Sequence, residues 1–399
     1  MSWWQRLYVS LRGFHVTVQS LGGYGATLAK VLRVWREKGW RAVRHSSRQR
    51  MEDYSALSYE LWWKTHDPCD ESHLARLKLF MPLWRHRPLV SVVMPVFNPP
   101  IDCLEAAIES VRAQIYEDWQ LCIADDASTQ PEVRACLEKY AQLDSRIQVV
   151  FRPRNGHISA ASNSAIQIAR GAYVAMFDHD DLLTPHALFW MVEALQRVPQ
   201  ARLVYSDEDK VDDQGRRSNP YFKSDLNYDL LLSQNMVTHL AMYETALLNR
   251  LGGFREGFEG AQDHDLVLRA IEQLTPDQVV HVPRVLYHWR MHAASTAQDM
   301  AAKPYAVTAA VHAIQDHLDR TQASARVEVI PALNMYRVRY ALPQPAPLVS
   351  IIIPTRNAHD LVRQCLESIR RISTYTAYEI LLVDNGSDDP AALQYFGQL

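Results

Sequence analysis

Apolar residues recur in two different patterns along the middle of the chain. Short, mostly apolar runs predict buried strands at 89–97, 119–124, 147–151 and 173–177. Apolar residues at helical spacing predict helices after these strands, at 102–114, 131–141, 158–169 and 185–197. Four strand–helix units in a row indicate an α/β fold with a mostly parallel sheet flanked by helices.

Polar residues follow each predicted strand, and ligands of an open α/β sheet bind beyond the carboxyl ends of its strands. These candidate site residues are Asn98, Asp125, Asp126, Asn155, Gly156 and the run Asp178 to Asp181. In an extended chain Asp178 and Asp180 point the same way, and their mutual repulsion favours a cation between them. Carboxylate oxygens suit Mg²⁺ or Mn²⁺. An acidic loop that caps the next helix is the alternative, and this stretch alone does not decide between them.

The chain beyond residue 200 is less regular. A strand is predicted at 202–205, directly before the acidic run 206–210. Further predicted elements are a strand at 279–285, helices at 265–273 and 304–319, a strand at 326–330 and a stiff proline-rich linker at 343–347. We therefore predict four parts: a helical, basic N-terminal region (1–87), the main α/β domain (88–300), a connecting segment (301–347) and a partial second α/β repeat (348–399).

The last of these parts repeats the start of the main domain. Residues 348–354 echo residues 89–95 at an offset of 259 residues. Such self-similarity indicates an internal duplication. The second copy has Asn385 at the position of Asp126, and it stops before any counterpart of Asp178. We therefore expect the second copy to lack the candidate metal site.

Charge is distributed unevenly along the chain. The net charge is −3, which provides no global field that favours nucleic acid. Residues 1–50 nevertheless carry ten Lys and Arg against one acid, Glu37. Tryptophans and aliphatic residues recur among these charges at near-helical spacing, a pattern that suits peripheral contact with an anionic membrane. A helix packed on its own domain is the alternative interpretation.

Cysteine usage and hydropathy indicate the compartment. The five cysteines are odd in number and form no CxxC pair, which favours a reducing compartment without structural disulfides or zinc. No apolar run is long enough to span a membrane, and no signal peptide is evident. Together with the basic N-terminus, these features predict a cytoplasmic location, peripheral at the inner face of the cell membrane.

Five motifs, in order along the chain, resemble one known family. They are Val93–Asn98, Ala124–Ser128, Asn155–Ala161, Asp178–Asp181 and Gly260–Asp263. They resemble the nucleotide-sugar glycosyltransferases of family 2, which share the GT-A fold, over residues 89–292 and again at 348–399. The runs 205–210 and 283–290 look like the bacterial branch that builds O-antigen and related surface polysaccharides, including rhamnosyltransferase-like members.

The resemblance implies how a nucleotide-sugar donor is held. Asp180 with Asp178 would hold Mn²⁺ or Mg²⁺ against the diphosphate as a Lewis acid, although one carboxylate of this motif often touches the ribose instead. Asp126 would accept an N–H of the base, with helix capping as its alternative. For Phe97, packing in the core is the alternative. The implied donor-binding residues are Pro95, Phe97, Asn98, Asp125, Asp126, Asn155, Asp178 and Arg290.

The resemblance also implies a catalytic base. Asp263 lies where the family places the carboxylate that removes a proton from the acceptor hydroxyl. Gln262 stands where the family usually has Glu, and Asp265 is the local competitor for the role. A single base without an evident nucleophile favours direct displacement with inversion. The remaining expected contacts are His292 at the metal, with a core histidine as its alternative, and Asn235 and His239 on the acceptor side.

We therefore expect a metal-dependent, inverting glycosyltransferase with a lipid-linked or oligosaccharide acceptor in cell-surface polysaccharide synthesis. The second copy is expected to have no transferase activity. One alternative is a sugar nucleotidylyltransferase, which the run 98–100 disfavours because it is no glycine-rich phosphate loop. The other is a non-catalytic saccharide-binding scaffold partner. The sequence does not identify the donor sugar, the nucleotide, the acceptor, the linkage or the choice between Mn²⁺ and Mg²⁺.

Overall fold

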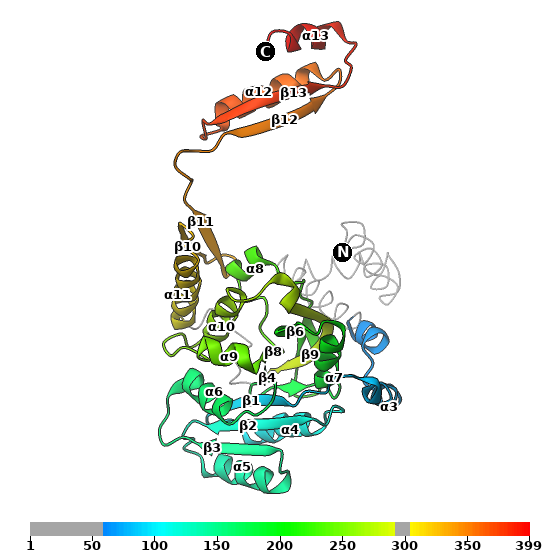
Figure 1. Ribbon diagram of the computed structural model, residues 1–399, viewed down its shortest axis with the longest axis vertical. Coiled ribbons are helices and arrows are strands. Elements are labelled where there is room, and N and C mark those ends of the chain that lie inside the picture. The colour runs from blue at the N-terminus through cyan, green and yellow to red at the C-terminus, as the bar shows by residue number, and fades with distance from the viewer. Residues whose placement is uncertain (1–58, 292–303) are drawn as a thin grey trace, which may run out of the picture. The chain divides into compact units, whose positions relative to one another are not determined.

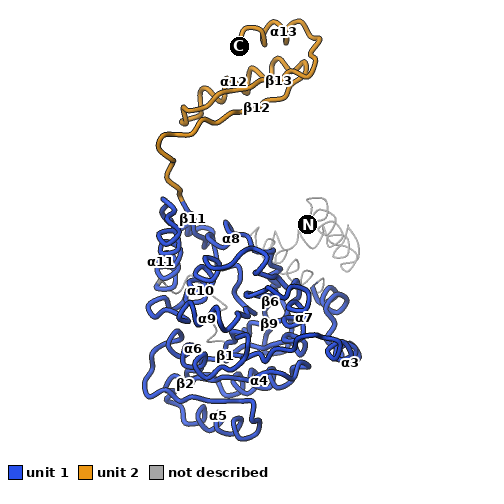
Figure 2. Tube along the Cα trace, viewed as in Figure 1, with its two compact units in different colours: residues 1–338 blue, residues 339–399 orange. Residues whose placement is uncertain are grey.

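The computed structural model describes residues 59–291 and 304–399, and the chain divides into two compact units (Figures 1 and 2). The first unit ends at Val338 and the second runs from Arg339 to Leu399. Within the described residues, no helix has the length and apolar character needed to cross a bilayer. The basic segment 1–50, for which membrane contact is predicted, lies outside these residues.

One large sheet organises the first unit, with strand order β3-β2-β1-β4-β8-β6-β9-β5 and β7 paired to β6. Its strands are β1 Val90–Val96, β2 Trp119–Asp125, β3 Ile147–Phe151, β4 Tyr173–Met176, β5 Leu182–Leu183, β6 Leu203–Val211, β7 Arg217–Tyr221, β8 Ala241–Glu244 and β9 Val279–Arg290. The first four strands in this order pair in parallel. The other half is mixed, because β8 runs antiparallel to both β4 and β6 while β9 is parallel to β6.

Helices cover both faces of this sheet (Figure 1). The helices are α3 Glu71–Lys78, η1 Met81–Leu83, α4 Ile101–Arg112, α5 Pro131–Leu143, α6 His157–Gln167, α7 Ala187–Arg197, α8 Tyr228–Ser233, α9 Thr245–Leu251, α10 Gln262–Ile271, η2 Pro276–Gln278 and α11 Pro304–Arg320. Val92 and Met94 of β1 join the core cluster under α4, α5 and α7, whereas Val93 joins the cluster under α6, α9 and α10. Burial on both faces explains why these strands are mostly apolar and confirms the predicted α/β class.

The acidic run 206–210 lies inside β6 and not in a loop after it, so the predicted strand end at 205 is wrong. Three carboxylates of this run are buried, and each pairs with a basic side chain that lies outside the run. These pairs are Asp207 with His281, Glu208 with Lys223, and Asp209 with Arg217 and His288. Buried charges of this kind are tolerated only when they are paired. The partners therefore allow an acidic sequence to form a central strand.

The second unit is a small version of the start of the sheet. It contains β12 Val349–Thr355, α12 His359–Ile372, β13 Tyr378–Asp384 and α13 Pro390–Phe396. The parallel register pairs Val349 with Tyr378, and the first unit pairs Val90 with Trp119 at the same spacing. The internal repeat predicted from the sequence is therefore present in the structure. Between α11 and the second unit, β10 Ala325–Ile330 and β11 Met335–Tyr340 form a two-stranded sheet.

Candidate active site

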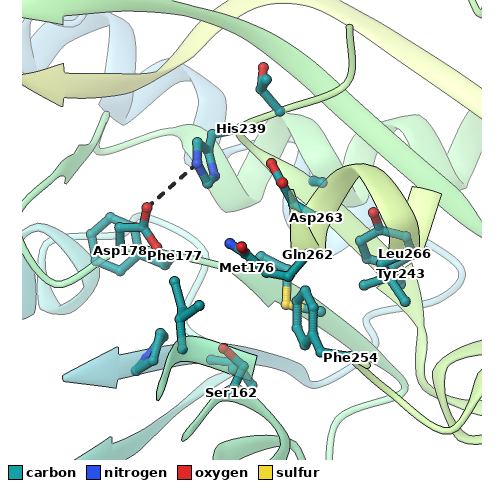
Figure 3. Close-up of a pocket in the computed structure, with 15 residues that line it drawn as sticks. Ser162, Met176, Phe177, Asp178, His239, Tyr243, Phe254, Gln262, Asp263 and Leu266 are labelled. Carbon is teal, nitrogen blue, oxygen red and sulfur yellow. Dashed lines mark ion pairs between the residues drawn. The ribbon is translucent and has the colours of Figure 1, made fainter. Parts of the chain in front are cut away.

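A pocket lies beyond the carboxyl ends of β1 and β4, on the face that α6 and α10 cover (Figure 3). Its empty volume is about 450 Å³. Apolar side chains such as Met176, Phe254 and Leu266 form one wall. The polar lining includes Asp178 after β4, His239 before β8 and Asp263 near the start of α10. The structure therefore brings together two carboxylates that are 85 residues apart in the sequence.

Asp178 is the carboxylate of the acidic run that faces this pocket. Its Oδ2 lies 3.6 Å from Nε2 of His239 (Figure 3). Burial raises the pKa of Asp178; His239 opposes this rise, whereas the negative charges of Asp180 and Asp263 add to it. A carboxylate in such a position gains from any cation that enters the pocket, because a cation would favour its charged form.

Asp181 has a different environment from Asp178. Its Oδ2 accepts a hydrogen bond from the Tyr287 hydroxyl at 2.6 Å, and its Oδ1 accepts one from the Arg290 backbone N–H at 2.9 Å. Burial, followed by the charges of Asp180 and Asp178, raises the pKa of Asp181 well above its usual value. Asp181 therefore ties the acidic run to β9, whereas Asp178 lines the pocket.

Aromatic contacts hold the ring of His239 beside Asp178. Its ring stacks on Tyr287 with centroids 4.6 Å apart and planes 13° apart, and it meets Trp289 edge to face at 5.5 Å. Nδ1 of His239 is buried and has no hydrogen-bond partner among the residues that the structure describes. The ring therefore directs one nitrogen at Asp178 and keeps the other unused.

A buried ion pair fixes the backbone on which His239 sits. Nζ of Lys223 donates to Oε2 of Glu208 at 3.0 Å and to the carbonyl oxygens of Val237 and His239 at 2.7 and 2.5 Å. The same Glu208 oxygen accepts from the Thr238 hydroxyl at 2.7 Å and from the His239 N–H at 3.0 Å. Burial lowers the pKa of Lys223, and Glu208 opposes that shift. The sequence shows Glu208 within an acidic run but carries no signal that this run supports the site.

Asp263 is oriented by hydrogen bonds that leave it at the pocket wall. Its Oδ2 accepts from Nδ2 of Asn235 at 2.7 Å, and its Oδ1 accepts from the His264 N–H at 2.9 Å. Oδ1 of Asn235 in turn accepts from the backbone of Val237 and Thr238 at 3.2 and 3.3 Å. The two residues proposed on the acceptor side, Asn235 and His239, therefore each contact one of the pocket carboxylates.

The competitor Asp265 points away from the pocket into the interior. It is completely buried and forms ion pairs with Arg255 and Arg269. Both of its oxygens are thereby occupied by guanidinium groups. A carboxylate held in this way has no access to an acceptor hydroxyl, which leaves Asp263 as the base candidate of α10.

The proposed nucleotide-binding residues lie at the ends of β1 and β2, where several of them brace one another. Asp126 pairs with Arg152 and accepts the Gly156 N–H at 3.0 and 3.1 Å. Nδ2 of Asn155 donates to the Asp126 carbonyl at 3.3 Å. Oδ1 of Asp125 accepts the Ser128 N–H at 3.3 Å. Asp126 therefore anchors the 152–156 loop and does not cap the helix α5.

Asn98 and Phe97 also take definite positions. Oδ1 of Asn98 accepts the Thr129 N–H at 2.8 Å and its own N–H donates to the Ser128 hydroxyl at 3.0 Å, so it joins the loops after β1 and β2. The Phe97 side chain is 44% exposed, which excludes the core interpretation. Pro95 lines the pocket, and its carbonyl oxygen lies 2.9 Å from Nδ1 of His179.

The negative charges of Asp178 and Asp180 are the feature of the site that suits a divalent cation. Among the described residues, no group of three or more His, Cys, Asp or Glu side chains is arranged to hold a metal ion. The negative charge of Asp180 nevertheless disfavours the charged form of Asp178. Nη1 of Arg290 is buried without a hydrogen-bond partner within residues 59–291 and 304–399, and it would suit an anion such as a diphosphate. His292, the third expected metal contact, lies outside the described residues.

Comparison with known proteins identifies the family of the chain. The model of the family described as glycosyl transferase family 2 matches residues 91–252 and 350–395, which together exceed half of the chain. The chain belongs to glycosyl transferase family 2. The match includes the Asp178 motif and both copies of the repeat. Its first segment ends at residue 252, before Asp263.

Two curated relatives and one solved structure illustrate the similarity. The chain is 48% identical to uncharacterized protein y4gI of Sinorhizobium fredii over 78% of its length, and 35% identical to O-antigen biosynthesis protein RfbC of Myxococcus xanthus over 92%. It covers 34% and 30% of these proteins, so it spans about a third of their length. A crystal structure of S. aureus TarS 1–349 in complex with UDP-GlcNAc aligns with a TM-score of 0.48 at 18% identity, over 57% of this chain and 66% of that one.

Proposed function

We propose that this glycosyltransferase moves a sugar from a nucleoside diphosphate donor to a lipid-linked saccharide acceptor by a direct displacement with inversion. The observation that supports the proposal is the placement of Asp178 and Asp263 on the wall of one pocket, with only Asp263 braced by an amide. The O-antigen biosynthesis name of one relative supports a role in cell-surface polysaccharide synthesis. The proposed location remains cytoplasmic, at the inner face of the membrane.

Asp263 would act on the acceptor. Its carboxylate would remove the proton of the acceptor hydroxyl while that oxygen attacks the anomeric carbon, and the bond from this carbon to the diphosphate oxygen would break. Such general base catalysis typically contributes about 10²–10⁴-fold. Asn235, which donates to Oδ2 of Asp263, would occupy one lone pair of that oxygen and orient the carboxylate toward the pocket. His239 would border the sugar from the opposite side.

Asp178 and Asp180 would act on the donor. A Mn²⁺ or Mg²⁺ ion, when bound to these two carboxylates, supplies charge neutralisation for the diphosphate. The guanidinium of Arg290, with its unpartnered Nη1, would provide a second positive contact. Asp126, Asp125, Asn98 and Asn155 would shape the nucleotide end of the site, where the exposed ring of Phe97 is available to a base.

The test is to screen nucleotide sugars with the pure protein for nucleotide release, with Mn²⁺, with Mg²⁺ and with a chelator. We expect release from one donor, dependent on the metal, and transfer when a lipid-linked saccharide is added. The variant Asp180→Ala should lose release, whereas the exposed Asp360→Asn of the second unit should retain it. Metal-independent release or full activity of Asp180→Ala would contradict the donor assignment. Absence of any donor turnover would support the scaffold alternative.

A further inference from the structure

An apolar knob with a basic surround projects from the segment that joins α3 to β1. Leu79, Phe80 and Leu83 are 74%, 56% and 76% exposed. They lie in sequence between residues that are anchored in the core, since Leu77 and Met81 are buried. The alternation gives this segment an inner and an outer side, and the outer side carries the large apolar residues.

The segment is mounted firmly on the first unit, so its exposed side chains keep a fixed direction. The Trp84 ring packs against Phe189 with centroids 4.9 Å apart and against Tyr116 at 6.0 Å. Nε2 of Gln196 donates to the His86 carbonyl at 2.7 Å. Segments that merely fray do not have such anchors, and large apolar groups gathered on a fixed surface mark an interaction site.

The charged residues of this stretch of the sequence are all basic. Between Glu71 and Asp102 the sequence contains four Lys and Arg and no acidic residue. One of the four, Arg87, pairs with Asp118 at 2.7 Å. The other three, Arg76, Lys78 and Arg85, are exposed and make no ion pair with the described part of the chain. Apolar side chains surrounded by unpaired cations complement the interface of a bilayer that contains anionic lipid.

We infer that the α3–η1 segment, residues 76–85, docks on an anionic membrane by inserting Leu79, Phe80 and Leu83 among the lipid head groups. The inference rests on the proposed membrane location of the acceptor and names the surface that makes the contact. It is independent of the basic segment 1–50. A knob with three apolar side chains and three cations holds the first unit at the interface through area and charge together, so its attachment weakens with salt but does not vanish.

Flotation with vesicles tests the inference on the full chain. Vesicles of phosphatidylcholine with 30% phosphatidylglycerol would be compared with pure phosphatidylcholine. The variant L79S/F80S/L83S should bind the mixed vesicles at least tenfold more weakly, and R76S/K78S/R85S should lose most of the difference between the two vesicle types. The control L143S/L333S/L361S removes leucines of similar exposure elsewhere (57%, 65% and 70%) and should bind as the original protein does.

If the basic segment 1–50 dominates the affinity for vesicles, a dye placed in the α3–η1 segment shows whether that segment contacts the membrane. An environment-sensitive dye on Leu83→Cys, in a Cys365→Ser background, should shift to the blue on the mixed vesicles, whereas the same dye on Leu143→Cys should not. The absence of a shift at position 83 overturns the inference, whatever the total binding. Nucleotide release without vesicles is measured in parallel, and it should be unchanged in all variants. Loss of that release concerns the proposed function and not this surface.

Discussion

The two copies of the repeat have the same backbone plan but unequal surroundings. In the first unit Tyr116 donates to the Pro88 carbonyl, and in the second Tyr375 donates to the Pro347 carbonyl. Asn98 bonds the loop after β2, and Asn357 bonds the loop after β13 in the same manner through Asp388 and Asp389. Both asparagines have a positive φ, 47° and 53°. The duplication has therefore preserved the parts that shape the loops.

The surroundings of the copies differ on the face that carries the pocket in the first unit. Val93 and Cys122 are fully buried there, whereas Ile352 and Leu381 at the same positions of the second unit are 65% and 44% exposed. In the first unit this face packs against α6. The pocket also needs residues from β4, the loop before β8 and α10, and residues 339–399 contain no such elements. A preserved strand pair is therefore a scaffold, and the chemistry depends on what is added to it.

The largest effect is expected on the rate of transfer when the proposed base, Asp263, is replaced. Asp263→Asn should lower the rate of transfer about 10²–10⁴-fold, because an amide cannot accept the proton of the acceptor. Donor binding should persist, since the donor is assigned to Asp178, Asp180 and the residues that follow β1 and β2, and not to Asp263. Transfer kinetics and donor titration would measure the two properties separately. A transfer rate within threefold of the original would remove Asp263 from the mechanism.

The next largest effect is expected when a residue of the first copy is replaced by its counterpart in the second copy. Asp126→Asn gives the first unit the residue that the second has at Asn385, and it removes the charge that pairs with Arg152. We expect the KM for the donor to rise roughly tenfold, as for the loss of a hydrogen bond to a charged group. Asp118→Asn, which breaks the exposed pair with Arg87, is the matched control. An unchanged KM would show that the carboxylate only braces the loop.

A smaller effect, on stability, is expected from substitutions of the equivalent residues Asn98 and Asn357. Asn98→Ala removes hydrogen bonds to Thr129 and should lower the free energy of unfolding of the first unit by about 1–3 kcal/mol. Tryptophan fluorescence during urea unfolding reports this unit selectively, because residues 339–399 contain no tryptophan. Asn357→Ala should therefore leave the fluorescence midpoint unchanged. A shift with Asn357→Ala would mean that the two units unfold together.

The sequence predicted the strands well where both faces of the sheet are buried. The runs that became β1 and β2 are mostly apolar and buried throughout, so their strands and the polar residues after them could be placed without a structure. The acidic end of β6 could not, because its burial depends on partners such as Lys223 and Arg217 that pair with it in the folded chain. Hydrophobic periodicity carries no record of such pairs.

The same reasoning applies to the site. Asp178 and Asp263 were placed by motif, and the structure brings them to one pocket. The division of labour between Asp178 and Asp181 was not predictable, since it depends on the Tyr287 hydroxyl reaching Asp181 from β9. The choice between Asp263 and Asp265 likewise depended on the two arginines that bury Asp265. Spacing locates carboxylates, but their partners decide which of them are available for chemistry.

The smallest expected effect is a null result that sharpens the comparison between the copies. Asn385→Asp restores the first-copy residue in the second unit and should create no activity, because the elements that carry the other pocket residues are lacking there. The experiment is best done in the Asp263→Asn background, where any new transfer is visible against a low rate. Asp384→Asn in the same background is the control for a nonspecific effect on the β13 end. If Asn385→Asp raised transfer tenfold or more, the second unit would hold a site of its own, and the two copies would differ in a single residue and not in their surroundings.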